Sequence, residues 1–123
     1  MKSNPVGWFE IPVTDMGRAT KFYERVLNTK LTPVVMESLT MAWFPMEPGI
    51  EGASGSLIKA ETYVPSYNGS MVYFSVDDIE GTLERVKMNG GKIIRGKSSI
   101  GEYGFVGHFE DCEGNRVALH STQ

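Results

Sequence analysis

The sequence predicts an α+β fold in which two tandem βαβββ modules form a curved mixed sheet around a cleft. Three observations lead to this prediction. The chain has 123 residues, the length of one domain. Each half carries the pattern of a short alternating strand, an amphipathic helix and three further short strands. The two halves also align with each other at a nearly constant offset, which indicates an internal duplication. We therefore treat residues 1–123 as a single domain of two modules.

The first module is expected over residues 5–59. A strand opens it because apolar side chains alternate there with more polar ones. A helix follows, since apolar residues then recur at helical spacing after a capping residue, Thr14 or Asp15. Short apolar runs separated by proline and glycine predict three more strands. The expected elements are a strand at 6–13, a helix that ends at Asn28, and strands at 31–36, 40–44 and 52–59.

A linker is expected at 60–69, which is rich in turn-forming residues, and the second module at 70–121. Alternation again predicts an opening strand, and Asp77 or Asp78 can cap the helix that follows it. Asn89, with two glycines after it, supplies a helix stop. The expected elements are a strand at 71–76, a helix from Ile79 to Asn89, and strands at 92–99, 105–110 and 115–121.

The duplication can be tested residue by residue. A shift of 63 aligns the opening strands, the caps and the helix starts, whereas a shift of 62 aligns the last strands. A difference of one residue between the two shifts is a change in loop length. The aligned pairs are Trp8 with Met71, Val13 with Val76, Asp15 with Asp78, Gly52 with Gly114, Ser56 with Ala118 and Leu57 with Leu119.

A cleft is expected on the sheet faces that do not pack against helices. Each module buries one apolar sheet face under its helix, so the opposite faces can close on each other. Side chains alternate along a strand, and the cleft walls therefore come from the positions between the helix-packing residues. These positions are Trp8, Glu10, Ser56, Ile58, Met71, Tyr73, Ala118 and His120.

Composition and charge limit the partners. A net charge of −3 offers no basic field for a nucleic-acid backbone. No run approaches the length of a membrane span, and the polar start lacks the apolar segment of a signal peptide. We expect a cytoplasmic protein that binds neither nucleic acid nor membrane. The single cysteine, Cys112, lies between two acidic residues in a turn, which should keep its thiol protonated.

Several motifs resemble those of a known superfamily. They are Trp8 to Met16, Phe22-Tyr23 with Val26-Leu27, Val76 to Ile79, Ile100 to Gly104, Phe109 to Asp111 with Glu113 to Asn115, and Ala118 to Ser121. The chain resembles the vicinal oxygen chelate superfamily, which includes glyoxalases, bleomycin-resistance proteins and extradiol dioxygenases. It is especially similar to bacterial proteins described as predicted enzymes related to lactoylglutathione lyase. One fold hosts many chemistries, so the resemblance predicts the fold more firmly than the reaction.

The resemblance also implies where a metal would be held. Metal-dependent members take one ligand from the first and one from the last strand of each module, and these positions are occupied here by Trp8, Ser56, Met71 and Ala118. None offers the imidazole or carboxylate that zinc, nickel or iron requires. We expect no metal and no other cofactor. A shifted site built from Glu10, His120 and His108 is the alternative.

The expected function is binding of a small, partly apolar molecule in the cleft. Trp8, Met71 and Tyr73, with Ser56 and Ala118, would line it. Tyr103, in a glycine-flanked loop, would cover its mouth. The resemblance further suggests a homodimer.

An enzyme is the competing class. In a metal-independent lyase or isomerase, a partly desolvated Glu10 would abstract a proton while His120 or His108 stabilises an oxyanion. Alternatively, Glu10 pairs with a cation such as Arg116, and each histidine makes only a structural hydrogen bond. Glyoxalase chemistry that depends on a metal is disfavoured.

Overall fold

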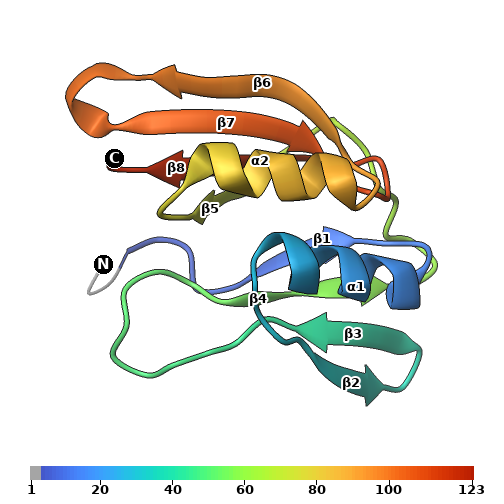
Figure 1. The fold of residues 1–123 in the computed structure, drawn as a ribbon. Coiled ribbons are helices and arrows are strands. Elements are labelled where there is room, and N and C mark those ends of the chain that lie inside the picture. Colours follow the sequence, from blue (N-terminus) through green and yellow to red (C-terminus); the bar gives the residue numbers. More distant parts are fainter. Residues whose placement is uncertain (1–3) are drawn as a thin grey trace.

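The computed structural model describes residues 4–123 and contains two four-stranded sheets, each with one helix on its face (Figure 1). In the first module, Asp15 caps the helix by accepting a hydrogen bond from the Arg18 backbone N–H. The helix ends just before Asn28, whose φ of 52° is left-handed. Its elements are β1 (Phe9–Pro12), α1 (Met16–Val26), β2 (Thr32–Met36), β3 (Leu39–Trp43) and β4 (Gly55–Lys59).

The second module repeats this order. Asp78 caps its helix by accepting a hydrogen bond from the Gly81 backbone N–H, as Asp15 does for Arg18 in the first module. One short 3₁₀ turn, which the sequence did not predict, precedes the last hairpin. The elements are β5 (Tyr73–Ser75), α2 (Ile79–Met88), β6 (Lys92–Ser99), the 3₁₀ turn η1 (Gly101–Tyr103), β7 (Phe105–Glu110) and β8 (Arg116–Ser121).

Strand order and register show the duplication directly. The sheets have the orders β1-β4-β3-β2 and β5-β8-β7-β6, with the first pair of each parallel and the others antiparallel. Glu10 is paired with Ser56 in the first sheet, and Tyr73 with Ala118 in the second. These pairs are related by the offsets of 63 and 62 found in the sequence. The predicted fold class is therefore confirmed.

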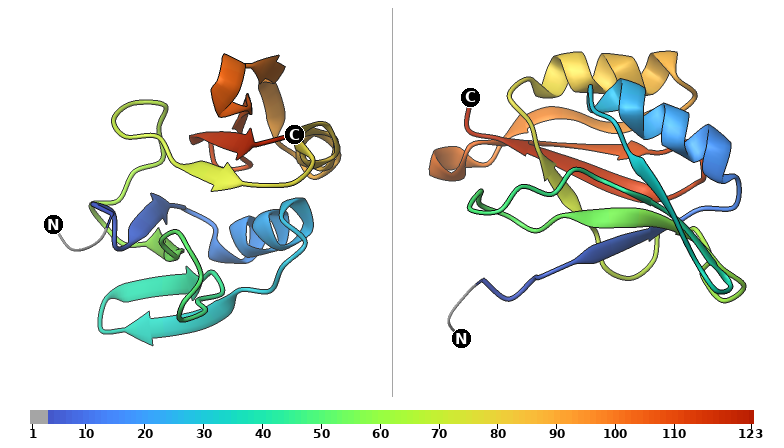
Figure 2. Two further views of the ribbon diagram at one scale, coloured as in Figure 1. Left: turned by 90° about the vertical axis from the view of Figure 1, so that its left-hand side faces the viewer. Right: turned by 90° about the horizontal axis from the view of Figure 1, so that it is seen from below.

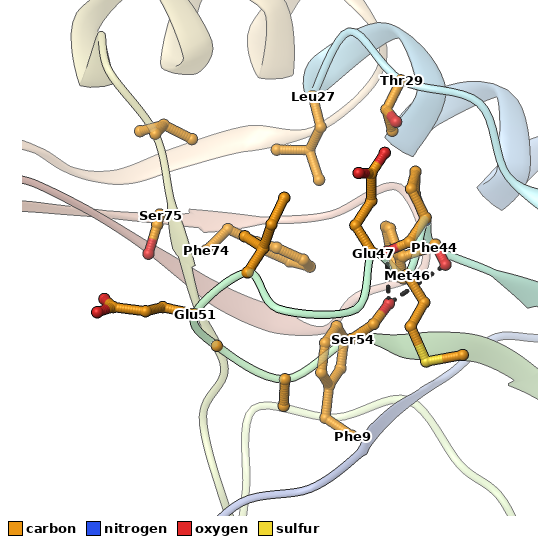
Figure 3. Close-up of a pocket in the computed structure, with 15 residues that line it drawn as sticks. Phe9, Leu27, Thr29, Phe44, Met46, Glu47, Glu51, Ser54, Phe74 and Ser75 are labelled. Carbon is orange, nitrogen blue, oxygen red and sulfur yellow. Dashed lines mark hydrogen bonds between the residues drawn. The ribbon is translucent and has the colours of Figure 1, made fainter. Parts of the chain in front are cut away.

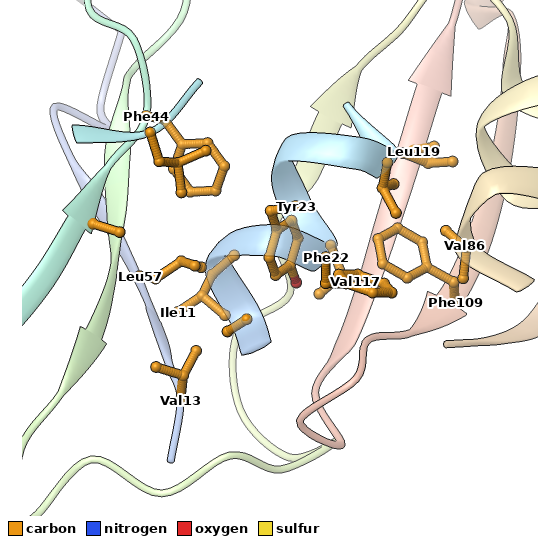
Figure 4. Packing of buried hydrophobic residues seen from close by; sticks show 14 of the residues in the cluster. Ile11, Val13, Phe22, Tyr23, Phe44, Leu57, Val86, Phe109, Val117 and Leu119 are labelled. Carbon is orange, nitrogen blue, oxygen red and sulfur yellow. The ribbon is translucent and has the colours of Figure 1, made fainter. Parts of the chain in front are cut away.

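Both helices lie on the same side of the molecule, and the core lies between them and the sheets (Figure 2, Figure 4). Phe9 and Phe74 meet at the seam between the modules with ring centroids 5.6 Å apart, and Phe22 of α1 lies 6.3 Å from Phe109 of β7. The modules therefore share one core, which contains Ile11, Val13, Tyr23, Phe44, Leu57, Val86, Val117 and Leu119 among others.

Polar contacts at the turn after β7 also join the modules. The carboxylate of Asp111 is buried and accepts a hydrogen bond of 2.6 Å from the Tyr23 hydroxyl of α1. Asn115 donates from its amide to the Pro12 carbonyl at 2.8 Å. Glu113 accepts from the backbone N–H and the hydroxyl of Thr14 and pairs with Arg18. A turn of the second module thus holds the start of α1.

Three strands are shorter than predicted by at least three residues. The segments expected at 6–13, 71–76 and 52–59 form strands only at Phe9–Pro12, Tyr73–Ser75 and Gly55–Lys59. β1 and β5 are edge strands that each pair with a single neighbour, over four and three residues. β4 starts at Gly55 because the residues before it belong to a long connection from β3.

Candidate functional site

We use the name helix-free face for the sheet side that carries Trp8, Glu10, Ser56, Tyr73, His108, Ala118 and His120. Strand alternation defines it, because the intervening residues Ile11, Leu57 and Leu119 belong to the core under the helices. His108 is directly paired with Ala118 across the β7–β8 ladder. Cross-strand partners project to the same side, so His108 shares this face with Ala118, a point that the sequence left open.

The first sheet contributes a tryptophan pair to this face. The rings of Trp8 and Trp43 meet edge to face, with centroids 5.2 Å apart. Trp43 is paired in register with Ser56, which is fully buried. Neither the Ser56 hydroxyl nor the Trp43 indole N–H has a hydrogen-bond partner within the described residues. Buried polar groups without a partner are uncommon, and these two lie side by side in the β3–β4 ladder.

Glu10 does not have the environment that the sequence suggested. Its side chain is exposed rather than partly desolvated, although it lies beside Ser56 on the neighbouring strand. It also forms no ion pair with Arg116 in the part of the chain that the structure describes. Glu10 and Arg116 line the same small cavity, of about 140 Å³, under the linker.

The second sheet carries two separate contacts between a histidine and a tyrosine. The Tyr73 hydroxyl lies 3.5 Å from His108 Nε2, at the outer limit of a hydrogen bond, and their rings meet edge to face. His120 Nε2 lies 2.7 Å from the Tyr103 carbonyl oxygen. A carbonyl can only accept, so Nε2 of His120 carries a hydrogen. This contact fixes η1, with its exposed Tyr103 side chain, over the end of β8.

The electrostatic surroundings keep His108 neutral. Partial burial lowers the pKa of His108, and the positive charges of Arg95 and Arg116 lower it further. A neutral imidazole beside a phenol can accept a proton or a hydrogen bond. Arg95 is a neighbour that the sequence did not indicate, and the strand register, which pairs it with His108, reveals it. Arg116 was expected only as a partner of Glu10.

The remaining predicted site residues differ in accessibility. Trp8 and Tyr73 are exposed, at 36% and 48%, and Met71 is half-buried just before β5. Ser56 and Ala118 are completely buried, so no ligand can reach either side chain in this conformation. The structure therefore places Tyr73 against His108 and His120 against the Tyr103 carbonyl, and it buries Ser56 and Ala118.

A larger cavity lies on the other side of the sheets, at the seam between the modules (Figure 3). Its volume is about 340 Å³, and the connection at 44–54 forms one wall. None of the site residues predicted from the sequence lines it. Phe9 and Phe74, which pack against the core on the helix side, form the floor of this cavity. The usable signal was the length of the connection, because hairpin loops are usually much shorter.

The next feature is the supply of metal-ligating side chains on the helix-free face and at the cavity. Between residues 4 and 123, no three histidine, cysteine, aspartate or glutamate side chains are grouped so as to hold a metal ion.

Burial and the flanking carboxylates of Asp111 and Glu113 raise the pKa of the Cys112 thiol to about 11, as expected for a protonated turn cysteine.

Comparison with known proteins supports a single family. The model of the Glyoxalase/Bleomycin resistance protein/Dioxygenase superfamily matches residues 6–119. A glyoxylase-like domain-containing protein of Didymella fabae is 32% identical over 118 residues, which cover 93% of this chain and 91% of the relative.

Solved structures agree on the fold. A glyoxylase/bleomycin resistance protein/dioxygenase domain from Frankia sp. superimposes with a TM-score of 0.74 at 15% identity, covering 98% of both chains. An antibiotic-binding protein from Streptomyces sp. superimposes with a TM-score of 0.70 at 22% identity, covering 100% of this chain and 99% of the other. No helix within residues 4–123 has the length and apolar character to cross a membrane. The chain belongs to the glyoxalase/bleomycin resistance protein/dioxygenase superfamily.

Proposed function

We propose that this protein binds a small, partly apolar molecule on the helix-free face. The observation that carries the proposal is the exposure there of aromatic side chains, Trp8 and Tyr73, with Tyr103 above the end of β8. Exposed aromatic rings that gather around polar groups are typical of ligand-binding surfaces. His108 and His120 supply those polar groups. The antibiotic-binding relative from Streptomyces sp. adds support, since it has the same fold.

We further propose that this binding needs no metal. At the four positions where the family places ligands, Trp8 and Ala118 carry no donor that suits a divalent cation, and Met71 offers only a thioether. The fourth, Ser56, is a neutral hydroxyl that is fully buried. This donor set does not fit a tight site for zinc, nickel or iron.

A thermal-shift screen tests the proposal. The panel contains thiol conjugates, aromatic antibiotics and small keto acids, and a true ligand raises the melting temperature because it stabilises only the folded state. Affinity should be the same after dialysis against a chelator and after addition of zinc or nickel. A ligand whose binding requires the added metal would contradict the metal-free proposal.

Substitutions on the helix-free face test whether the ligand binds there. Trp8→Ala and Tyr73→Ala should each weaken binding about tenfold or more, because each removes a large aromatic contact. Val35→Ala is the matched control, since Val35 is also an exposed apolar residue but lies on the outer strand β2. Equal affinities in all three variants would exclude the helix-free face.

The competing proposal is acid-base catalysis on the same face, with Glu10 as base and His108 or His120 stabilising an oxyanion. The hydrogen on Nε2 of His120, which now points to the Tyr103 carbonyl, supports it, because an oxyanion needs such a donor. In that case Glu10→Gln should abolish turnover of a bound ligand and leave its affinity largely intact. A homodimer is part of our proposal as well, and light scattering should give twice the mass of 13.6 kDa.

A further inference from the structure

The cavity at the seam between the modules has the size of a small-molecule site and is partly open to solvent. Its volume of about 340 Å³ lies within the usual range for such sites, roughly 300 to 1,000 Å³. It is enclosed by the end of α1, by β5 and by the connection between β3 and β4 (Figure 3). It lies on the helix side of the sheets, so it is distinct from the face to which we assign the main function.

The floor of the cavity is aromatic. Phe9, Phe44 and Phe74 come from three separate segments, and their ring centroids lie 5.4 to 5.6 Å from one another. Leu27 closes the floor at the end of α1. Aromatic rings attract cations through the negative charge of their faces, and this attraction is stronger where water is excluded.

The charges at the cavity are all negative. Glu47 lies at the end near Thr29, and Glu51 at the end near Ser75 (Figure 3). No lysine, arginine or histidine lines the cavity, and neither carboxylate forms an ion pair within residues 4–123. Two carboxylates without counterions beside an apolar floor create a negative potential that an organic cation would neutralise.

The connection at 44–54 projects from the first sheet and forms one side of the cavity. The Ser54 hydroxyl donates to the carbonyls of Phe44 and Pro45, which ties the base of the connection together. Beyond this tie, Met46 and Ile50 are exposed by 62% and 66% beside the opening. Apolar side chains placed there would lose their contact with water if a ligand with an apolar body occupied the cavity.

The two modules differ in the connection between their last two strands, and the cavity results from this difference. In the second module the equivalent connection, residues 111–115, is short and packs closely against Thr14 and Arg18 of the first module. In the first module the longer connection faces β5 and leaves the space open. One end of the seam is therefore filled by protein, and the other end is left hollow.

We propose that this cavity binds a small organic cation, an amine or quaternary ammonium group attached to an apolar body. The phenyl rings and Leu27 contact the apolar body and the charge, and Glu47 and Glu51 provide the neutralising field. The choice of a cation follows from the absence of positive side chains in the lining, since an anion would meet two carboxylates and no partner.

The test uses three probes of similar shape on the full chain. These are phenyltrimethylammonium, its uncharged isostere tert-butylbenzene, and the anion benzoate. Calorimetry and ¹H–¹⁵N correlation spectra should show that the cation binds most tightly and shifts the amides of residues 46–54 and 74–76. The double variant E47Q/E51Q should lose about fivefold or more of this affinity, as expected for two modest charge contacts.

The matched control is Glu37→Gln with Glu61→Gln. Both residues are exposed and neither lines the cavity, so this variant changes the net charge equally and should bind the cation like the unaltered chain. Three results would overturn the proposal: equal affinity for the uncharged isostere, equal loss in the two double variants, or amide shifts confined to Trp8, Tyr73 and their neighbours. The last would assign the cation to the helix-free face and leave the main proposal standing.

Discussion

His108 is held in an environment that opposes its protonation. Its imidazole is half-buried beside Tyr73, and two arginines, Arg95 and Arg116, carry positive charge toward it. Both burial and like charge lower the pKa of His108 below the ordinary value of about 6.5. The residue should therefore be uncharged throughout the neutral range, which suits a group that accepts a hydrogen bond from a ligand.

This environment gives His108 a measurable titration. Because the pKa of the folded state lies below that of the unfolded state, the unfolded chain binds the proton first as pH falls through about 6.5. The free energy of unfolding should therefore fall below that pH. It should fall less in the variant His108→Asn. NMR of the imidazole should give a midpoint below 6.5, and a midpoint at or above this value would contradict the assignment.

Residue-level chemistry was only partly predictable from the sequence. Alternation correctly separated Glu10 and Ser56 from their core-facing neighbours, because parity is a local property of a strand. It could not show that Ser56 is covered while Glu10 remains exposed. Burial of Ser56 is a property of the folded sheet, in which Ser56 pairs with Trp43 of β3 and the Trp43 ring meets that of Trp8.

At the scale of elements, the start of each helix is set by an aspartate. Asp78 precedes α2 and accepts from the Gly81 N–H at 3.0 Å, whereas the adjacent Asp77 is exposed and makes no such contact. The first turn of α2 thus gains a partner for one of its free N–H groups. The sequence allowed either aspartate as the cap, and the structure assigns the second.

Replacing the cap should destabilise the protein by a defined amount. Asp78→Ala should lower the free energy of unfolding by about 1 kcal/mol, the usual value for a lost N-cap, and Asp77→Ala should change it by less than about 0.5 kcal/mol. Urea denaturation followed by circular dichroism measures both. If the two variants proved equally stable, the assignment of the cap would be wrong.

Element boundaries were predicted best where pairing is local. β6 and β7 form a hairpin, and both have the bounds expected from their alternation. β1 and β4 are far apart in the sequence, and their shared ladder starts only at Phe9 and Gly55. The extra length predicted for β4, residues 52–54, belongs to the connection at 44–54, whose course is a tertiary property.

At the scale of the whole molecule, the turn at 111–115 couples the modules. Glu113 is enclosed, and burial would raise its pKa, but hydrogen bonds from Thr14 and Asp15 and the Arg18 guanidinium together lower it. The carboxylate is therefore charged at neutral pH and anchored to the segment before α1. Asp111, with Tyr23, provides a second bond between the same two regions.

Removing the Glu113 contacts should destabilise the first module. Glu113→Ala removes the acceptor of Thr14 and Arg18, and because water can replace it at these exposed donors, the unfolding free energy should fall by only about 0.5–1.5 kcal/mol. Both tryptophans of the chain, Trp8 and Trp43, belong to the first module, so their fluorescence reports on that module alone. The fluorescence transition should move to lower denaturant together with the circular dichroism transition.

Glu61→Ala is the control, because Glu61 is exposed and has no ion pair in the described part of the chain. It should change the stability by less than about 0.5 kcal/mol. A fluorescence transition unaffected by the Glu113 substitution would mean that the modules unfold independently.

The amide of Asn115 reaches in two directions, donating to the Pro12 carbonyl and accepting from the Ser66 backbone N–H. Non-covalent contacts therefore hold the second module to the first, independently of the covalent linker at 60–69. A protease that nicked the exposed stretch 66–70 should yield two pieces that co-elute on a sizing column and separate only in denaturant.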